Sequence, residues 1–139
     1  GVLDDSIGRI PEEDLLIRGG DLNGHVGKDR NGFEEVIGVN GFGDRNEDGE
    51  KILEFCQSRR LTITNTLFKK DDEKKITYKS GGAKTQIDYI LARKNGAMKI
   101  TDCKGIPGEA CLTQHRLVCS DLKIEGIKRN GILKIRSLT

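Results

Sequence analysis

Apolar runs and polar, glycine-rich stretches divide the first part of the chain. The run Leu15-Leu16-Ile17 stops at two glycines and predicts a buried strand. Residues 20–49 are dense in Gly, Asn and Asp and predict a long loop, which is unusual unless the loop is functional. Residues 2–10 predict a loop or the end of a helix, broken at Pro11.

A helical pattern follows the loop. Asn46 can cap a helix over residues 47–59, because an Asn side chain accepts hydrogen bonds from backbone N–H groups of the first turn. Acidic side chains fall in the first turn and arginines at the end, as the helix dipole favours. The predicted inward face holds Ile52, Leu53, Phe55 and Cys56.

Strand patterns fill most of the remainder. The predicted strands are 61–66, 76–78, 86–91, 99–103 and 116–124. A charged turn covers 69–75, and a turn at Gly81-Gly82 predicts a hairpin between 76–78 and 86–91. The pattern predicts an α/β (α+β) sandwich layer with a mixed sheet, in which one helix leaves much of a sheet face uncovered.

The length of 139 residues suits one domain, which we predict at 1–124, followed by a basic tail at 125–139. No apolar run is long enough to cross a membrane, and no signal peptide precedes the first strand. We therefore expect an intracellular protein, nuclear or cytoplasmic, without a membrane partner.

Charge is divided unevenly between the two parts of the chain. Residues 1–60 carry 8 basic and 14 acidic groups, a net −6, whereas residues 61–139 carry 16 basic and 8 acidic groups, a net +8. An acidic part beside a basic part suits a site for a metal and a polyanion. Ordinary surface charge without function is the alternative interpretation.

The cysteines do not indicate a metal framework. The chain has four cysteines without a C-x-x-C pair and only two histidines, which excludes a zinc framework. We expect reduced thiols, with Cys56 and Cys119 as small core residues within apolar patterns.

The first candidate motif is G-G-D-L-N-G-H, at residues 19–25. Asp21 lies at the end of a predicted buried strand, and Asn23 two residues later projects to the same side. Glycines around them allow a substrate to approach the backbone closely. An Asp/Asn/Gly turn without function is the alternative.

The second motif is Q-I-D-Y-I-L, at residues 86–91. Alternation puts Asp88 on the opposite face from Ile87 and Tyr89, within an otherwise apolar strand. A buried carboxylate without a partner is costly, and a histidine is a natural partner. A solvent-facing Asp on an edge strand is the alternative.

The third motif is T-Q-H-R-L-V, at residues 113–118. His115 lies at the mouth of a predicted strand, where a loop can deliver it to a site. A single histidine is more often structural than catalytic. Arg116 beside it can bind phosphate.

In this order, the three motifs resemble those of the endonuclease/exonuclease/phosphatase (DNase-I-like) superfamily. Within it, the chain is most similar to endonuclease domains of non-LTR retrotransposons and to retroelement-derived sequences called craniofacial development protein 2-like. The similarity covers roughly residues 10–124 and is carried by segments 19–27, 46–55, 65–68, 76–82, 86–91 and 106–111.

The resemblance implies a four-layer DNase-I-like fold, of which this chain is expected to hold the C-terminal half, with a mixed, mainly antiparallel sheet and few helices. It implies a metal-dependent phosphodiesterase or endonuclease that acts on DNA with Mg²⁺ or Mn²⁺. Asp21 would activate the attacking water and bind the metal, and Asn23 would position that water and contact the phosphate. Asp88 would hold the imidazole of His115, which would stabilise the developing charge, and Arg116 would bind phosphate.

The sequence departs from the superfamily in two respects. The first half of the superfamily fold supplies an Asn, a metal-binding Glu and usually a Tyr, and no counterparts precede Asp21. We therefore expect a truncated domain whose partners are the missing N-terminal half or a second copy. Gln114 stands where the superfamily usually has the Asp of Ser-Asp-His, and a neutral amide brings no charge to the metal.

Three functional hypotheses stay open. The first is a retroelement-type nicking endonuclease. The second is a catalytically inactive remnant that binds nucleic acid or a protein partner and loses nucleic acid as salt rises. The third is a phosphoesterase for a small molecule or lipid head group, because the fold hosts those activities as well.

Overall fold

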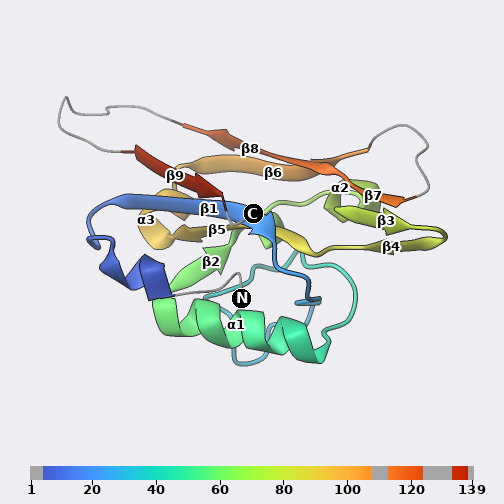
Figure 1. The fold of residues 1–139 in the computed structure, drawn as a ribbon, viewed down its shortest axis with the longest axis horizontal. Helices are drawn as coiled ribbons and strands as arrows, with labels where there is room; N and C mark the ends of the chain where they lie inside the picture. The colour runs from blue at the N-terminus through green and yellow to red at the C-terminus, as the bar shows by residue number, and fades with distance from the viewer. Residues whose placement is uncertain (1–4, 108–112, 124–132, 138–139) are drawn as a thin grey trace.

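The computed structural model describes residues 5–107, 113–123 and 133–137. A four-stranded sheet with the order β2-β5-β1-β9 forms its centre (Figure 1). Its strands are β1 (Leu15–Asp21), β2 (Leu61–Ile63), β5 (Asp88–Arg93) and β9 (Leu133–Ser137). The strand β5 runs antiparallel to β1 and β2, whereas β9 runs parallel to β1.

The segment predicted as a basic tail therefore contributes an edge strand. Leu133 and Ile135 alternate with basic residues in the sequence, but the strand that contains this alternation is only 5 residues long. Its pairing partner, β1, lies more than a hundred positions earlier, so only the tertiary structure reveals the strand.

Helix α1 (Glu47–Arg59) has the bounds that the sequence predicts. The Asn46 side chain accepts hydrogen bonds from Gly49 N (2.8 Å) and His25 N (3.0 Å), which joins the long loop to the helix. A Cβ at Gly49 would lie only 1.6 Å from the carbonyl oxygen of His25, so the close approach of loop and helix requires glycine.

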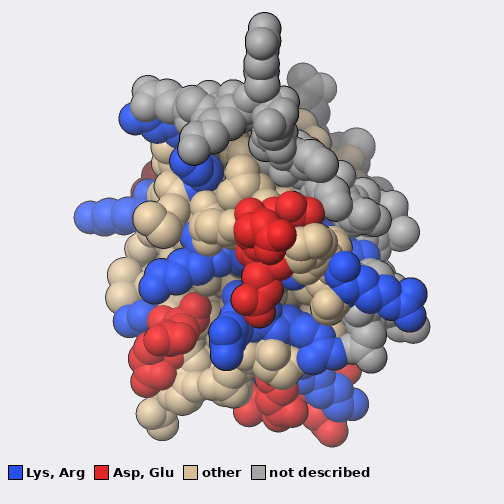
Figure 2. All heavy atoms as spheres, turned by 90° about the vertical axis from the view of Figure 1, so that its left-hand side faces the viewer, with Lys and Arg blue, Asp and Glu red and all other residues tan. Residues whose placement is uncertain are grey.

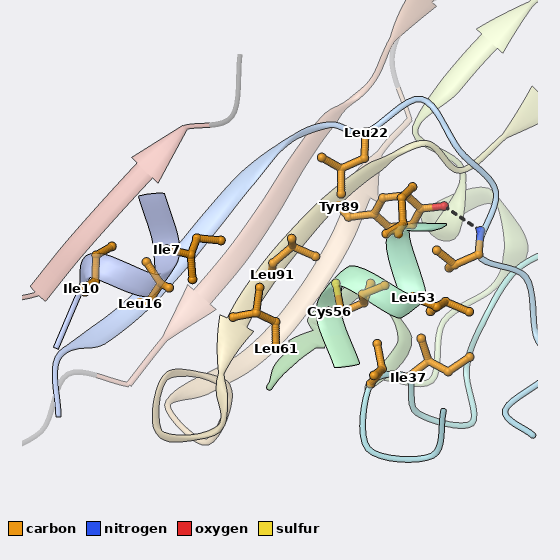
Figure 3. Packing of buried hydrophobic residues seen from close by; sticks show 14 residues of the cluster. Ile7, Ile10, Leu16, Leu22, Ile37, Leu53, Cys56, Leu61, Tyr89 and Leu91 are labelled. Carbon is orange, nitrogen blue, oxygen red and sulfur yellow. Dashed lines mark hydrogen bonds between the residues drawn. The ribbon is translucent and has the colours of Figure 1, made fainter. Parts of the chain in front are cut away.

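The main core lies between α1 and one face of the sheet. Of the predicted inward face, Ile52, Leu53 and Cys56 are buried and Phe55 packs against them. Burial raises the pKa of the Cys56 thiol to about 12, so this thiol stays protonated. Figure 3 shows Leu53 and Cys56 of the helix packed with residues of the sheet and of the N-terminal segment, among them Leu16, Leu61, Tyr89 and Leu91.

The second face of the sheet is also covered. Strands β6 (Ile100–Ile106) and β8 (Leu117–Leu122) pair antiparallel, and in Figure 1 they lie on the side of the sheet opposite α1. A smaller cluster of Ile17, Ala92 and Ile100 forms there. The mixed, mainly antiparallel α/β architecture with few helices is confirmed. The expectation of an uncovered face is wrong for this part of the sheet, because a strand pair supplies the layer.

The predicted hairpin has a different second strand. Strand β3 (Tyr78–Ser80) turns at Gly81-Gly82 and pairs with β4 (Ala83–Thr85), and β7 (Thr113–His115) pairs with its other edge. Residues 88–93 instead lie between β1 and β2 in the central sheet. The two-residue turn can only pair the residues directly beside it, whereas Tyr89, Leu91 and Ala92 of β5 are buried in the central sheet.

Two short helices lie where the sequence predicts a strand end and a turn. The predicted strand 61–66 ends at Ile63 and continues as the 3-10 helix η2 (Thr64–Thr66), and the charged turn contains α2 (Asp72–Lys75). The described residues between Leu22 and Asn46 form the expected long loop, with one isolated bridge at Ile37. In the described ranges, no helix combines the length and apolar character that crossing a lipid bilayer requires.

The end of the sheet far from the hairpin is closed by η1 (Asp5–Arg9) and α3 (Lys94–Ala97). The Arg93 guanidinium donates to the carbonyl oxygens of Ile10 (2.7 Å), Ile7 (3.2 Å) and Pro11. Figure 2 shows that acidic and basic side chains are interspersed on this end of the molecule.

Candidate functional site

Asp21 and Asp88 face each other across the central strand pair. Asp21 is the last residue of β1, Asp88 is the first of β5, and the antiparallel register makes them direct partners. Their side chains therefore project from the same face of the sheet. This face is opposite to the one that buries Tyr89 against α1, as the alternation of the sequence predicts.

His115 completes the group. Its Nδ1 lies 2.9 Å from Oδ2 and 3.0 Å from Oδ1 of Asp88, and its Nε2 lies 3.7 Å from Oδ2 of Asp21. The strand β7 places it opposite Tyr78, whose ring centroid is 4.7 Å from that of the imidazole. The structure thus brings together three residues that the sequence singled out, and the expected hydrogen bond between Asp88 and His115 is present.

The three side chains differ in exposure. Asp88 is only 16% exposed, whereas His115 is 47% and Asp21 is 43% exposed. Because Nδ1 of His115 lies within hydrogen-bond distance of the Asp88 carboxylate, that nitrogen carries the proton in the neutral imidazole, and Nε2 lies on the side of the more exposed Asp21. Asp88 therefore orients the ring, and the other two residues are available to a ligand.

Asn23 follows Leu22 beyond the end of β1 and has an exposed side chain. Its backbone has a positive φ of 51°, a conformation that Asn adopts more readily than most residues. Its N–H donates to Oδ1 of Asp21 (2.8 Å). This bond fixes one carboxylate oxygen of Asp21 and leaves Oδ2 directed toward His115.

Arg116 does not join this group. Its guanidinium donates to Oε2 (2.9 Å) and to the backbone oxygen of Glu73, and the side chain is 6% exposed. Hydrogen bonds from Lys84 and from Arg116 lower the pKa of the Glu73 carboxyl. The structure therefore gives Arg116 a partner within the fold, in place of the predicted open phosphate-binding position.

Gln114 projects away from the group. It lies opposite Lys79 in the β3–β7 pair, and as the neighbour of His115 in a strand it points to the other face. It therefore adds no side chain to the group.

The donor set fits a divalent cation in part. Asp21, Asp88 and His115 each offer a ligand atom within 4.8 Å of the others. Among the described residues, they form the group of His, Cys, Asp or Glu side chains that is close enough together to hold a metal ion. Both oxygens of Asp88 face the imidazole, so Asp21 provides the free carboxylate oxygen. One carboxylate with water and phosphate ligands suits Mg²⁺ or Mn²⁺, but a further carboxylate is needed for a complete site.

Tyr89 holds the loop that follows Asn23, a role that the sequence did not indicate. Its hydroxyl lies 2.7 Å from the carbonyl oxygens of Gly24 and Gln86. It also accepts from Val26 N at 3.2 Å, the hydrogen bond drawn in Figure 3. Burial raises its pKa above the ordinary value, so the hydroxyl stays protonated.

Beyond the end of β2, two polar side chains hydrogen-bond to the backbone of β5 in place of a strand partner. Thr64 Oγ1 donates to the carbonyl oxygen of Ile90 (2.9 Å). Asn65 accepts from Ile90 N (2.8 Å) and donates to the carbonyl oxygen of Asp88 (3.1 Å). The signal in the sequence is the polar run Thr-Asn-Thr after an apolar segment, since buried polar groups need partners.

Fold and site together define an α/β domain with a carboxylate–imidazole–carboxylate group at one edge of its central sheet. Over 120 residues, the chain is 34% identical to craniofacial development protein 2 of Bos taurus and 32% identical to that of Tragulus javanicus. It is therefore homologous to a segment of these proteins.

Both matches cover 83% of this chain but only 19% and 20% of the relatives, so the chain spans about a fifth of their length. No protein-family profile matches the chain. No solved structure matches it either.

Proposed function

We propose that this chain carries part of a metal-dependent phosphodiesterase site of the endonuclease/exonuclease/phosphatase type, which acts on DNA. The observation that carries the proposal is the group of Asp21, Asp88 and His115, with the imidazole held by one carboxylate and facing the other. The resemblance of the three motifs to retroelement endonucleases supports the same chemistry.

Each residue has a distinct role in this proposal. Asp88 accepts a hydrogen bond from Nδ1–H of His115 and thereby directs Nε2 toward the phosphate, where a proton on Nε2 would stabilise the developing charge. Asp21 Oδ2 orients the attacking water, and the exposed Asn23 contacts the phosphate. Asp21 would hold a Mg²⁺ or Mn²⁺ ion, which would supply charge stabilisation at the phosphoryl oxygens.

The single free carboxylate makes this site dependent on another segment. We propose that another part of a longer protein, or a second copy of the chain, supplies the further carboxylate that the metal requires. The small share of the relatives that the chain spans supports this view.

A nicking assay on supercoiled plasmid tests the proposal. With Mg²⁺ or Mn²⁺, and with the further carboxylate supplied by a second copy of the chain or by the rest of a longer protein, we expect nicking that EDTA stops and that Asp21→Ala and His115→Ala both abolish. Asp121→Asn, a change at an exposed carboxylate on β8, is the matched control and is expected to nick like the unaltered protein. Nicking that persists in both site variants would exclude this site as its source.

A second function is favoured by the single free carboxylate. In this alternative the chain binds DNA without cleaving it. No nicking above the Asp21→Ala background, together with binding that weakens steeply as salt rises, would overturn the catalytic proposal for this chain and support the alternative.

A further inference from the structure

Thr77 is a fully buried residue that contacts the backbone where β5 begins. Its Oγ1 accepts hydrogen bonds from Ile87 N (2.9 Å) and Asp88 N (3.0 Å), and its side chain is 0% exposed. Consecutive N–H groups of a regular strand point to opposite sides, so two that converge on one oxygen mark a bend. The hydroxyl therefore fixes the backbone from which the Asp88 carboxylate projects.

The backbone of Thr77 contacts the other side of the site. Its carbonyl oxygen accepts from Arg116 N (2.7 Å), and its N–H donates to the carbonyl oxygen of Thr85 (2.9 Å). Arg116 directly follows His115, and Tyr78, which follows Thr77, is the strand partner of His115. One buried residue thus connects the segments that carry the two members of the hydrogen-bonded pair.

We propose that Thr77 is a positioning residue that sets the geometry between Asp88 and His115. Its hydroxyl fixes the start of β5, and its backbone carbonyl fixes the end of β7, so the separation of carboxylate and imidazole depends on a single residue. A β-branched threonine suits this position because it has few rotamers. The catalytic meaning of this inference rests on the proposed function, whereas its geometric content does not.

The competing explanation is that the hydroxyl only satisfies two buried N–H groups. A residue of that kind affects stability and leaves the imidazole unchanged. Thr66 provides the matched comparison, because it is also 0% exposed and its Oγ1 accepts from a backbone N–H, that of Gly38 at 2.8 Å. Thr66 hydrogen-bonds to Ile63 O, away from the site.

The experiment follows the imidazole directly. The chain has only two histidines, so ¹⁵N-histidine labelling gives two ring systems, which a His25→Gln variant assigns. The ring ¹⁵N shifts distinguish the two neutral tautomers, and the Nδ1–H proton reports the bond to Asp88. Thr77→Val, Thr77→Ser and Thr66→Val are compared with the unaltered protein, together with their nicking rates.

We expect Thr77→Val to lose the protected Nδ1–H signal of His115 and to mix its tautomers, while nicking falls about 10- to 100-fold. Thr77→Ser keeps the hydroxyl and should restore both, and Thr66→Val should change neither. A Thr77→Val protein whose His115 ring signals match the unaltered protein would overturn the inference.

The positioning role of Thr77 can be tested even if Thr77→Val does not fold or the unaltered protein does not nick. If Thr77→Val does not fold, hydrogen exchange in the unaltered protein decides: the Asp88 amide should be as protected as those paired between β1 and β5, and free exchange would refute the contact. If the unaltered protein does not nick, the ring signals still test the positioning, and only the proposed function fails.

Discussion

The strands β1 and β5 end in two different ways. At one end, Ile17 is paired with Ala92, and both are buried between the sheet and the β6–β8 pair. At the other end, Asp21 is paired with Asp88, and the Asp21 side chain is 43% exposed. The same backbone geometry therefore produces an apolar contact at one end and a pair of carboxylates at the other.

The two ends are also held by different interactions. The apolar end is closed by packing and by Arg93, which binds carbonyl oxygens of the N-terminal segment, and its outer surface mixes both signs of charge (Figure 2). The polar end is held by side chains that bind the backbone, among them Asn65 and Tyr89. Burial therefore supplies stability at one end, while directed hydrogen bonds leave polar atoms free for a ligand at the other.

The largest effect is expected from a change at the polar end alone. Asp88→Asn keeps the size of the side chain but presents its amide to Nδ1 of His115, and we expect nicking to fall on the order of 10²- to 10⁴-fold. The thermal midpoint should change little, because the imidazole is 47% exposed. The nicking assay and a thermal melt measure the two effects. The Asp121→Asn protein is the control, and equal nicking by both variants would contradict the role of Asp88.

The complementary test changes the apolar end. Leu16 is 0% exposed within the main core, so Leu16→Ala should lower the free energy of unfolding by about 2–5 kcal/mol. At temperatures where the variant is folded, nicking per folded molecule should stay at its original value. Urea denaturation measures the first effect, and Val39→Ala, at a position 76% exposed, is the control. A catalytic defect in the folded variant would show that the two ends are coupled.

A smaller effect is expected at the cap of α1. Asn46→Ala removes the acceptor for Gly49 N and His25 N and should lower the free energy of unfolding by roughly 1 kcal/mol. Asn46→Asp keeps an acceptor and should restore most of this stability. Denaturation in urea distinguishes the two, and equal stability of both variants would show that the cap contributes nothing.

The smallest effect concerns the dependence of stability on pH. The pKa of Glu73 is lowered in the folded protein by hydrogen bonds from Lys84 and Arg116, so its stabilising contribution is present above its ordinary pKa of 4.5 and is lost as pH falls through the lowered value. Glu73→Gln should thus lower the thermal midpoint slightly at pH 7 and have less effect at pH 3. Glu54→Gln, at an exposed position on α1, is the control. A loss of thermal midpoint in Glu73→Gln that is larger at pH 3 than at pH 7 would contradict this prediction.

Local signals predicted some elements well. Helix α1 follows from its cap, its apolar period and its terminal charges, all of which lie within the segment itself. The orientation of Asp88 also follows from alternation along one strand. In these two cases the structural feature depends on neighbours in the sequence, which is why the pattern alone predicted it.

Pairing choices were less predictable. The returning strand of the hairpin was predicted at 86–91 but is β4, and residues 133–137 were predicted as a tail but pair with β1. Both errors concern partners, since one apolar strand can pair equally well with several others until the layers are assembled. The pairing of Arg116 with Glu73 has the same cause, because the two residues lie 43 positions apart.

The sequence by itself determined that Asp21 lies at the end of an apolar strand and that Asp88 lies on another, because the order of apolar and polar residues along a strand is a local feature. Only the tertiary structure decided that these carboxylates are direct partners, that His115 reaches both, and that Thr77 connects the segments between them. The physical reason is that such contacts join residues far apart in the chain, and their geometry is set by the register and packing of whole strands.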